Sequence, residues 1–333
     1  MDYFQTRATQ LLKIRHPIIQ AGMSWASSSA ALPAAVSNAG GLGVLAAGPL
    51  YVEDFTCALD ALRAATPHPF AVNIPLYRPH AAELLDAMHA RRVPVVIASQ
   101  GGPKAHLSRF HDVGSVWIQV VSTLEHALKA QDAGVDAIVV VGTEAGGHPP
   151  ANGVSTMVTV RRVLQEISIP VIAGGGAADG WGIAALLALG AEAVQLGTRF
   201  LLTEEATLHA AYKEAVLAAG VADTALIGQR SGQPVRGLRN QFAHQIFQAE
   251  QEHVSDEAYD ALFKSSTLKQ AALEGNVDWG KVEAGQSAGL IHHIKPVADV
   301  MHDLLHELDL AIQRMARMRS GTPFLTTESA GKV

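Results

Sequence analysis

Eight short apolar runs over residues 16–196 constrain the fold more than any other feature of this sequence. Each run is rich in Val, Ile or Leu and does not alternate with polar residues. Continuous apolarity is typical of strands that are covered on both faces, as in a parallel sheet. The predicted strands are His16–Gln20, Gly43–Ala46, Phe70–Ile74, Pro94–Ala98, Val116–Val120, Asp136–Val141, Pro170–Ala173 and Ala193–Leu196.

Helix-length segments separate these runs, and several of them end in a glycine turn signal. Strands that alternate with helices in this way predict an α/β protein whose eight strands close into a (β/α)8 barrel of the TIM type. An open, doubly wound sheet is the alternative. The predicted helices are 28–38, 52–65, 81–91, 123–133, 156–166 and 180–189.

The alternation stops after the eighth run. Residues 204–290 are more polar and contain helical patches at 209–219, 235–252 and 256–273. The amphipathic stretch 297–318 then resembles the last helix of the barrel. We therefore expect residues 1–203 and 291–319 to form the barrel and residues 204–290 to form a helical insertion after strand eight. That insertion would lie on the face that carries the active site of such barrels, as a lid or substrate domain. Residues 320–333 are expected to form a flexible tail.

Charge and composition narrow the function. The chain has 333 residues and a net charge of −6, which gives no electrostatic footprint for nucleic acid or for an anionic membrane. Any phosphate must then be held mainly by backbone N–H groups. The lone cysteine, Cys57, excludes an internal disulfide and a multi-cysteine metal site, and its apolar surroundings predict that it is buried. No signal peptide or membrane span is evident, so we expect a soluble cytoplasmic protein with a small-molecule substrate. A homodimer is compatible with this interpretation.

Two glycine-rich turns follow the last two predicted strands. The first contains three consecutive glycines, which let the backbone approach a ligand closely, and a helix with free N–H groups follows it. Many barrels hold a phosphate at this place. The alternative is a pair of tight turns without a ligand. Arg199 either neutralises the phosphate or pairs with an acidic residue. The candidate cofactor-binding residues at these two strand ends are Gly174, Gly175, Gly176, Gln195, Gly197 and Thr198.

A histidine follows a glycine pair at the end of strand six. Gly146 and Gly147 bring the backbone to the barrel mouth, and His148 comes next. A histidine can act as an acid or a base near neutral pH. We therefore predict that His148 is the catalytic residue.

The turn after strand one offers a surface for a flat ring. Its residues are small, and Met23 adds a soft apolar side chain. The alternative is a turn that is packed by Met23 and Trp25 without a ligand. Asn73 at the end of strand three could bond a ring carbonyl, and Val120 at the end of strand five could supply backbone contacts. The candidate ring-side residues are Ala21, Gly22, Met23, Asn73 and Val120.

These segments together resemble the nitronate monooxygenase family, which includes FMN-dependent enoyl-ACP reductases and NAD(P)H:quinone reductases. The resemblance covers nearly the whole chain. It is carried by the segments 16–23, 36–43, 70–73, 144–148, 170–176, 195–200, 235–240, 275–278 and 284–290.

The resemblance implies non-covalent FMN, with its phosphate on Gly175, Gly176, Gly197 and Thr198, its ring against Gly22 and Met23, and His148 as the active-site histidine. The first function it favours is oxidation of alkyl nitronates with dioxygen. The alternative within the family is a reductase in which NAD(P)H reduces the flavin, which then reduces an enoyl thioester or a quinone. An alternative outside it is a flavin-free phosphate-binding barrel, either an isomerase or a ligand sensor.

Two segments differ from patterns within the family. Residues 98–103 resemble the glycine-rich turn of the enoyl reductases more than the corresponding segment of some nitronate monooxygenases. After His148, the sequence has Pro149 and Pro150, where those reductases carry an apolar residue and a glycine. The substrate therefore stays open at this point.

Overall fold

The eight predicted strands form a single barrel. The computed structural model describes residues 4–320, and all hydrogen-bonded neighbours in the barrel sheet are parallel, in the order β1-β8-β7-β6-β5-β4-β3-β2. Every predicted strand is present, with boundaries shifted by two residues at most. The strands are β1 Ile18–Gln20, β2 Gly43–Ala46, β3 Phe70–Pro75, β4 Val95–Ser99, β5 Val116–Val121, β6 Ala137–Val141, β7 Val171–Gly174 and β8 Ala193–Leu196.

The barrel closes between β1 and β2. Ile19 and Leu42 form a parallel bridge there, and the backbone of Leu42 bonds both to Gln20 and to Ile18 at 3.0 Å. The buried Gln20 side chain adds bonds to Val44: its Oε1 accepts from the backbone N–H at 2.9 Å, and its Nε2 donates to the carbonyl at 3.1 Å. This closure rules out the open, doubly wound sheet.

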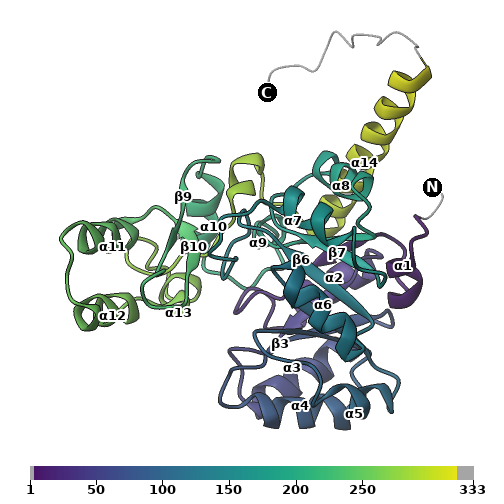
Figure 1. Ribbon diagram of the computed structural model, residues 1–333, viewed down its shortest axis with the longest axis horizontal. Helices are drawn as coiled ribbons and strands as arrows, with labels where there is room; N and C mark the ends of the chain where they lie inside the picture. Colours follow the sequence, from purple (N-terminus) through teal and green to yellow (C-terminus); the bar gives the residue numbers. More distant parts are fainter. Residues whose placement is uncertain (1–3, 321–333) are drawn as a thin grey trace.

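Helices cover the outside of the barrel (Figure 1). The sequence pattern predicts all of them except the short helices α1, α5 and α9. The barrel helices are α1 Arg7–Leu12, α2 Ala31–Asn38, α3 Val52–Ala65, α4 Ala81–Ala90, α5 Leu107–His111, α6 Leu124–Ala133, α7 Thr156–Val163, α8 Gly180–Ala188, the single turn α9 Thr198–Leu201, and α14 Val297–Ser320.

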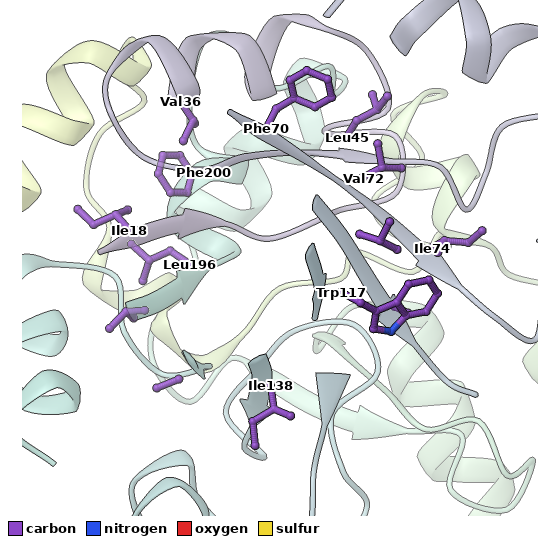
Figure 2. Packing of buried hydrophobic residues seen from close by; sticks show 14 of the residues in the cluster. Ile18, Val36, Leu45, Phe70, Val72, Ile74, Trp117, Ile138, Leu196 and Phe200 are labelled. Atoms are coloured by element: carbon purple, nitrogen blue, oxygen red, sulfur yellow. The ribbon is translucent and has the colours of Figure 1, made fainter. Parts of the chain in front are cut away.

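Two apolar layers explain why the strands read as continuous apolar runs. Ile18 belongs to the layer between strands and helices, whereas its neighbour Ile19 belongs to the layer inside the barrel. Figure 2 shows the outer layer, where Ile18, Leu196 and Phe200 gather near Val36 of α2. Because both faces of each strand are buried, neither face needs polar residues.

Residues 204–290, called the insertion below, lie beside the barrel (green in Figure 1). They have an apolar core of their own, which includes Phe242, Tyr259 and Phe263. Their elements are α10 Ala210–Leu217, β9 Thr224–Ile227, β10 Val235–Leu238, α11 Gln241–Gln251, α12 Asp256–Lys264, α13 Leu268–Ala272 and the 3-10 helix η1 Gln286–Leu290.

The prediction of a helix from residue 235 to 252 is wrong at its start. Val235–Leu238 is a strand that pairs antiparallel with β9, and Arg236 also forms a bridge to Gly147 of the barrel. β10 has a partner on each edge, β9 on one and Gly147 on the other, so its backbone groups form hydrogen bonds that a helix start would leave unpaired. The insertion is therefore not wholly helical.

The prediction that Cys57 is buried is also wrong, because its side chain is exposed. Helix α3 buries Phe55, Leu59 and Leu62, which lie on one face at helical spacing. Cys57 is two residues from Phe55 and therefore faces away from that stripe.

Helix α14 packs against α8 and α2 and then extends past the barrel (Figure 1). It includes Ser320, the first residue of the predicted tail. The rest of that tail, residues 321–333, lies outside the described residues. Among residues 4–320, no helix has both the length and the apolarity needed to cross a bilayer.

Candidate active site

A cavity of about 1200 Å³ lies at the carboxyl ends of the barrel strands. Segments that follow the strands line it, together with three stretches of the insertion around Tyr212, Lys269 and Glu283. Apart from Arg199, every candidate residue named from the sequence lines this one cavity. They are Ala21, Gly22, Met23, Asn73, Val120, Gly146, Gly147, His148, Gly174, Gly175, Gly176, Gln195, Gly197 and Thr198.

The glycine turn after β7 forms a cradle of backbone N–H groups. Gly175 and Gly176 have φ values of +103° and +82°, which residues with side chains rarely adopt. Their N–H groups make no backbone hydrogen bond within residues 4–320. The start of α8 is less free than the sequence suggests, because Asp179 caps it at the N–H of Gly182 and Glu307 accepts from the N–H of Gly180. The turn itself is therefore the better anion site.

The turn after β8 completes this side of the cavity. Thr198 Oγ1 accepts a hydrogen bond of 3.0 Å from the N–H of Gly285, so its own hydroxyl hydrogen remains for another acceptor. Arg199 does not line the cavity; its Nη2 donates to the carbonyls of Leu202 and His293. Burial lowers the pKa of the Arg199 guanidinium to about 10, and Asp303 and Glu307 oppose that change. Arg199 therefore has a structural role, because it links the segment at Leu202 to the segment at His293.

Residues at the carboxyl ends of β1, β3 and β8 offer contacts for a flat polar ring. Gly22 packs so closely on Asn73 that an added Cβ would lie 2.3 Å from the Asn73 side chain. The Asn73 amide nitrogen donates to the carbonyl of Ile97 at 3.0 Å. Gln195 Oε1 is buried and has no hydrogen-bond partner in the described structure. A buried acceptor without a partner is costly, so it marks a place where a bound group donates.

His148 stands at the cavity mouth with a fixed orientation. Its Nδ1 lies 3.0 Å from the carbonyl oxygen of Pro234, which belongs to the insertion. A carbonyl can only accept, so in the neutral imidazole Nδ1 carries the hydrogen and Nε2 has the free lone pair. The neutral ring therefore presents a proton acceptor.

Two segments of the insertion grip the loop that carries His148. Gly147 exchanges two backbone hydrogen bonds with Arg236 of β10, at 3.1 and 2.7 Å. On the other side, the N–H of Gln286 donates to the carbonyl of Glu144 at 3.0 Å. An added Cβ at Gly146 would lie 2.6 Å from the backbone of Ala284 and Gly285. The glycine pair is therefore required for close contact with the insertion.

Glu283 is a cavity residue that the sequence analysis missed. It is the one acidic residue among the described residues that line the cavity. Its carboxylate lies against Gly147, 3.3 Å from where a Cβ would stand, and its carbonyl accepts a bond of 2.7 Å from Tyr212. Burial raises the pKa of the Glu283 carboxyl, while His148, Lys281 and Arg78 act in the opposite direction. One signal could have found Glu283 in the sequence: it directly precedes the segment 284–290, which carries part of the family resemblance.

The barrel, the glycine cradle and the histidine loop agree with known proteins. A sequence profile of the nitronate monooxygenase family matches residues 5–91 and 83–307. The chain belongs to the nitronate monooxygenase family. It is therefore an oxidoreductase of a flavin-dependent family, which argues against the flavin-free isomerase or sensor.

Three relatives illustrate the range of this family. A probable nitronate monooxygenase of Staphylococcus saprophyticus is 31% identical over 87% of this chain and 94% of its own. A 5-hydroxy-7a-methyl-1-oxo-octahydro-1H-indene-4-carboxyl-CoA dehydrogenase of Rhodococcus jostii is 29% identical over 96% and 100%. Among solved structures, FabK from Thermotoga maritima is 40% identical, covers 95% of this chain and 99% of its own, and has a TM-score of 0.89.

The cavity fits a flavin on its own evidence. Gly175 and Gly176 offer free N–H groups to a phosphate at one end. Gln195, which pairs with Gly174 in the neighbouring strand, offers a buried acceptor without a partner, which suits an N–H of the ring. Gly22 and Met23 line the cavity beside Gly197 and carry no charge, so a flat apolar ring could pack on them.

Proposed function

We propose that this protein is an FMN-dependent oxidoreductase that uses NAD(P)H to reduce an unsaturated acyl chain carried as a thioester. The observation that carries the proposal is the cavity, whose 1200 Å³ exceeds the range of about 300–1,000 Å³ that is usual for one small ligand. A single anion cradle suits the one phosphate of FMN, and room remains for a substrate with a long carrier arm.

The mouth of the cavity supports an anionic carrier. Arg78 and Lys269 are exposed and line it, together with His80 and His126. Cations attract the phosphates of a coenzyme A or carrier-protein arm. The Rhodococcus jostii relative is named for a carboxyl-CoA substrate, which supports the same substrate class.

The residues of this chain have distinct roles in the proposal. Gly175, Gly176 and Thr198 would hold the FMN phosphate, and Gln195 would accept from the ring. A bound flavin supplies two-electron redox chemistry. His148 orients the thioester and exchanges protons at Nε2, the nitrogen left free by Pro234.

Oxidation of alkyl nitronates with dioxygen is the second candidate. The family profile and the Staphylococcus saprophyticus relative favour it, and His148 would then orient the nitronate or act as the base. A nitronate is small and would leave much of the cavity unused.

One experiment separates the two. The purified protein is first checked for bound FMN by its absorbance and by release of the cofactor on denaturation. It is then mixed without oxygen with NADH, NADPH or propyl nitronate, and flavin bleaching is followed. Bleaching by a nicotinamide nucleotide, followed by reoxidation with crotonyl-CoA, is the expected result. Bleaching by the nitronate alone would overturn the thioester proposal in favour of the second candidate, and a protein that binds no flavin would overturn both.

A further inference from the structure

The arrangement around His148 does not supply the proton that the proposed reaction requires. Reduction of an unsaturated thioester adds a hydride to one carbon and a proton to its neighbour. Neutral His148 cannot give that proton from the ring nitrogen that is free, because its hydrogen is on Nδ1 and is bonded to Pro234. A second group that holds a proton at neutral pH must therefore face the same cavity.

Glu283 meets this requirement by its position. It lines the cavity from the insertion, and its carboxylate lies against the backbone of Gly147, next to His148. No hydrogen bond or ion pair to its carboxylate is present among residues 4–320, although neighbouring backbone is held firmly by Tyr212 and Thr198. The Glu283 side chain is half-buried and lines the cavity, so its carboxyl group is available to a ligand bound there.

We propose that Glu283, in its protonated form, is the catalytic acid that delivers this proton to the substrate, an inference that rests on the proposed thioester reduction. The carbon–carbon π bond would break, a C–H bond would form at the β-carbon with a hydride that NAD(P)H supplies by way of the bound cofactor, and a second would form at the α-carbon with the Glu283 proton. The Glu283 O–H bond breaks and leaves a carboxylate. Solvent protons restore the acid through His148 at the open mouth.

The surroundings of Glu283 are consistent with this role. Burial raises the pKa of the carboxyl, so more of it stays protonated near neutral pH than for an exposed glutamate. The charged groups that act on it are His148 after β6, Lys281 on its own segment and Arg78 after β3, and all three favour the carboxylate. They would stabilise the negative charge that remains once the proton has left. Tyr212 stays protonated, because burial raises the pKa of its hydroxyl as well.

The test uses holoenzyme and follows the two half-reactions separately. Wild type, Glu283→Gln and Glu274→Gln are reduced without oxygen by NAD(P)H and then mixed with crotonyl-CoA or with ferricyanide. Glutamine keeps the shape of Glu283 but carries no acidic proton. Glu274 is exposed on the same insertion and does not line the cavity, so its variant makes the same side-chain substitution away from the cavity.

We expect Glu283→Gln to keep its flavin and its rate of reduction, and to be reoxidised by crotonyl-CoA about 10²- to 10⁴-fold more slowly, the usual range for loss of a general acid. Reoxidation by ferricyanide should be unchanged, because that acceptor takes no proton from the protein. Glu274→Gln should match wild type throughout. In wild type the crotonyl-CoA step should slow as the pH rises through the Glu283 pKa, and this slope should be absent from Glu283→Gln.

Two results would overturn the inference. One is a Glu283→Gln variant that crotonyl-CoA reoxidises at the wild-type rate. The other comes from flavin-free protein: an infrared difference spectrum between wild type and Glu283→Gln at pH 7 should contain the carbonyl band of a protonated carboxyl, and its absence would show an ionised Glu283. Failure of the proposed function is distinct, because crotonyl-CoA would then not reoxidise even the wild type.

Discussion

The imidazole Nδ1 of His148 lies 3.0 Å from the carbonyl oxygen of Pro234, although the two residues are 86 positions apart in the sequence. His148 belongs to a barrel loop, and Pro234 belongs to the insertion. The insertion therefore decides which nitrogen of the histidine faces the cavity.

Replacing His148 by asparagine should separate catalysis from cofactor binding. Asparagine cannot exchange a proton near neutral pH, so we expect turnover to fall about 10²- to 10⁴-fold while flavin stays bound. Steady-state rates and the flavin-to-protein absorbance ratio measure both effects. His244→Asn, at an exposed position of α11, is the control and should behave as wild type. If flavin is lost from His148→Asn, the residue is structural.

Replacing Gly175 by valine should expel the flavin. Its φ of +103° is strained for any side chain, and an added Cβ would lie 3.0 Å from Thr156 Oγ1. We expect colourless protein that still folds, as followed by circular dichroism. Gly102→Val is the control, since Gly102 lines the cavity with open space around its Cα and an ordinary φ. A yellow Gly175→Val protein would mean that the phosphate binds elsewhere.

Replacing Gln195 by leucine should have opposite effects on stability and on binding. In the flavin-free wild type, the buried Gln195 acceptor has no partner, and this destabilises the protein by about 1–3 kcal/mol. Leucine removes that acceptor. We expect a higher Tm without flavin and a flavin Kd that is about 2- to 10-fold weaker, the value of one ordinary hydrogen bond.

The matched comparison for that prediction is Gln119→Leu. Gln119 bonds to the Trp117 indole and to the carbonyl of Gly101, so its loss should lower the Tm of the flavin-free protein. Equal Tm changes in the two variants would contradict the interpretation of Gln195.

Lys281 should make stability depend on pH. Burial lowers the pKa of its ammonium group to about 8, with Glu283 acting in the other direction. The unfolded value is about 10.4, so between these two values the unfolded chain holds more protons on this residue, and folding stability rises with pH. The unfolding free energy of wild type minus that of Lys281→Met, from urea titrations, should therefore increase from pH 8 to pH 10. A constant or falling difference would show that Lys281 is not buried as described.

The barrel and the glycine turns that line the cavity were predictable because both depend on local patterns. Apolar runs define β1 to β8, and the glycines at 174–176 must follow a strand end. The partners of His148 were not predictable in this way. Pro234 reaches His148, and Glu283 reaches the cavity, only through the packing of the insertion, and no periodicity marks them. The exposure of Cys57 could have been predicted from the sequence, because a position two residues from Phe55 falls on the other face of α3.

The insertion holds the loop of His148 through backbone hydrogen bonds to Gly147 and Glu144, and this affects how such proteins can diversify. One contiguous stretch of chain supplies a wall of the substrate cavity, the carbonyl that orients His148 and the carboxyl of Glu283. A recombination event that exchanged this stretch between relatives would change the shape of the cavity and its acidic and basic groups together, while the glycine turns after β7 and β8 stayed intact. Substrate range and acid–base chemistry would then be inherited as a single unit.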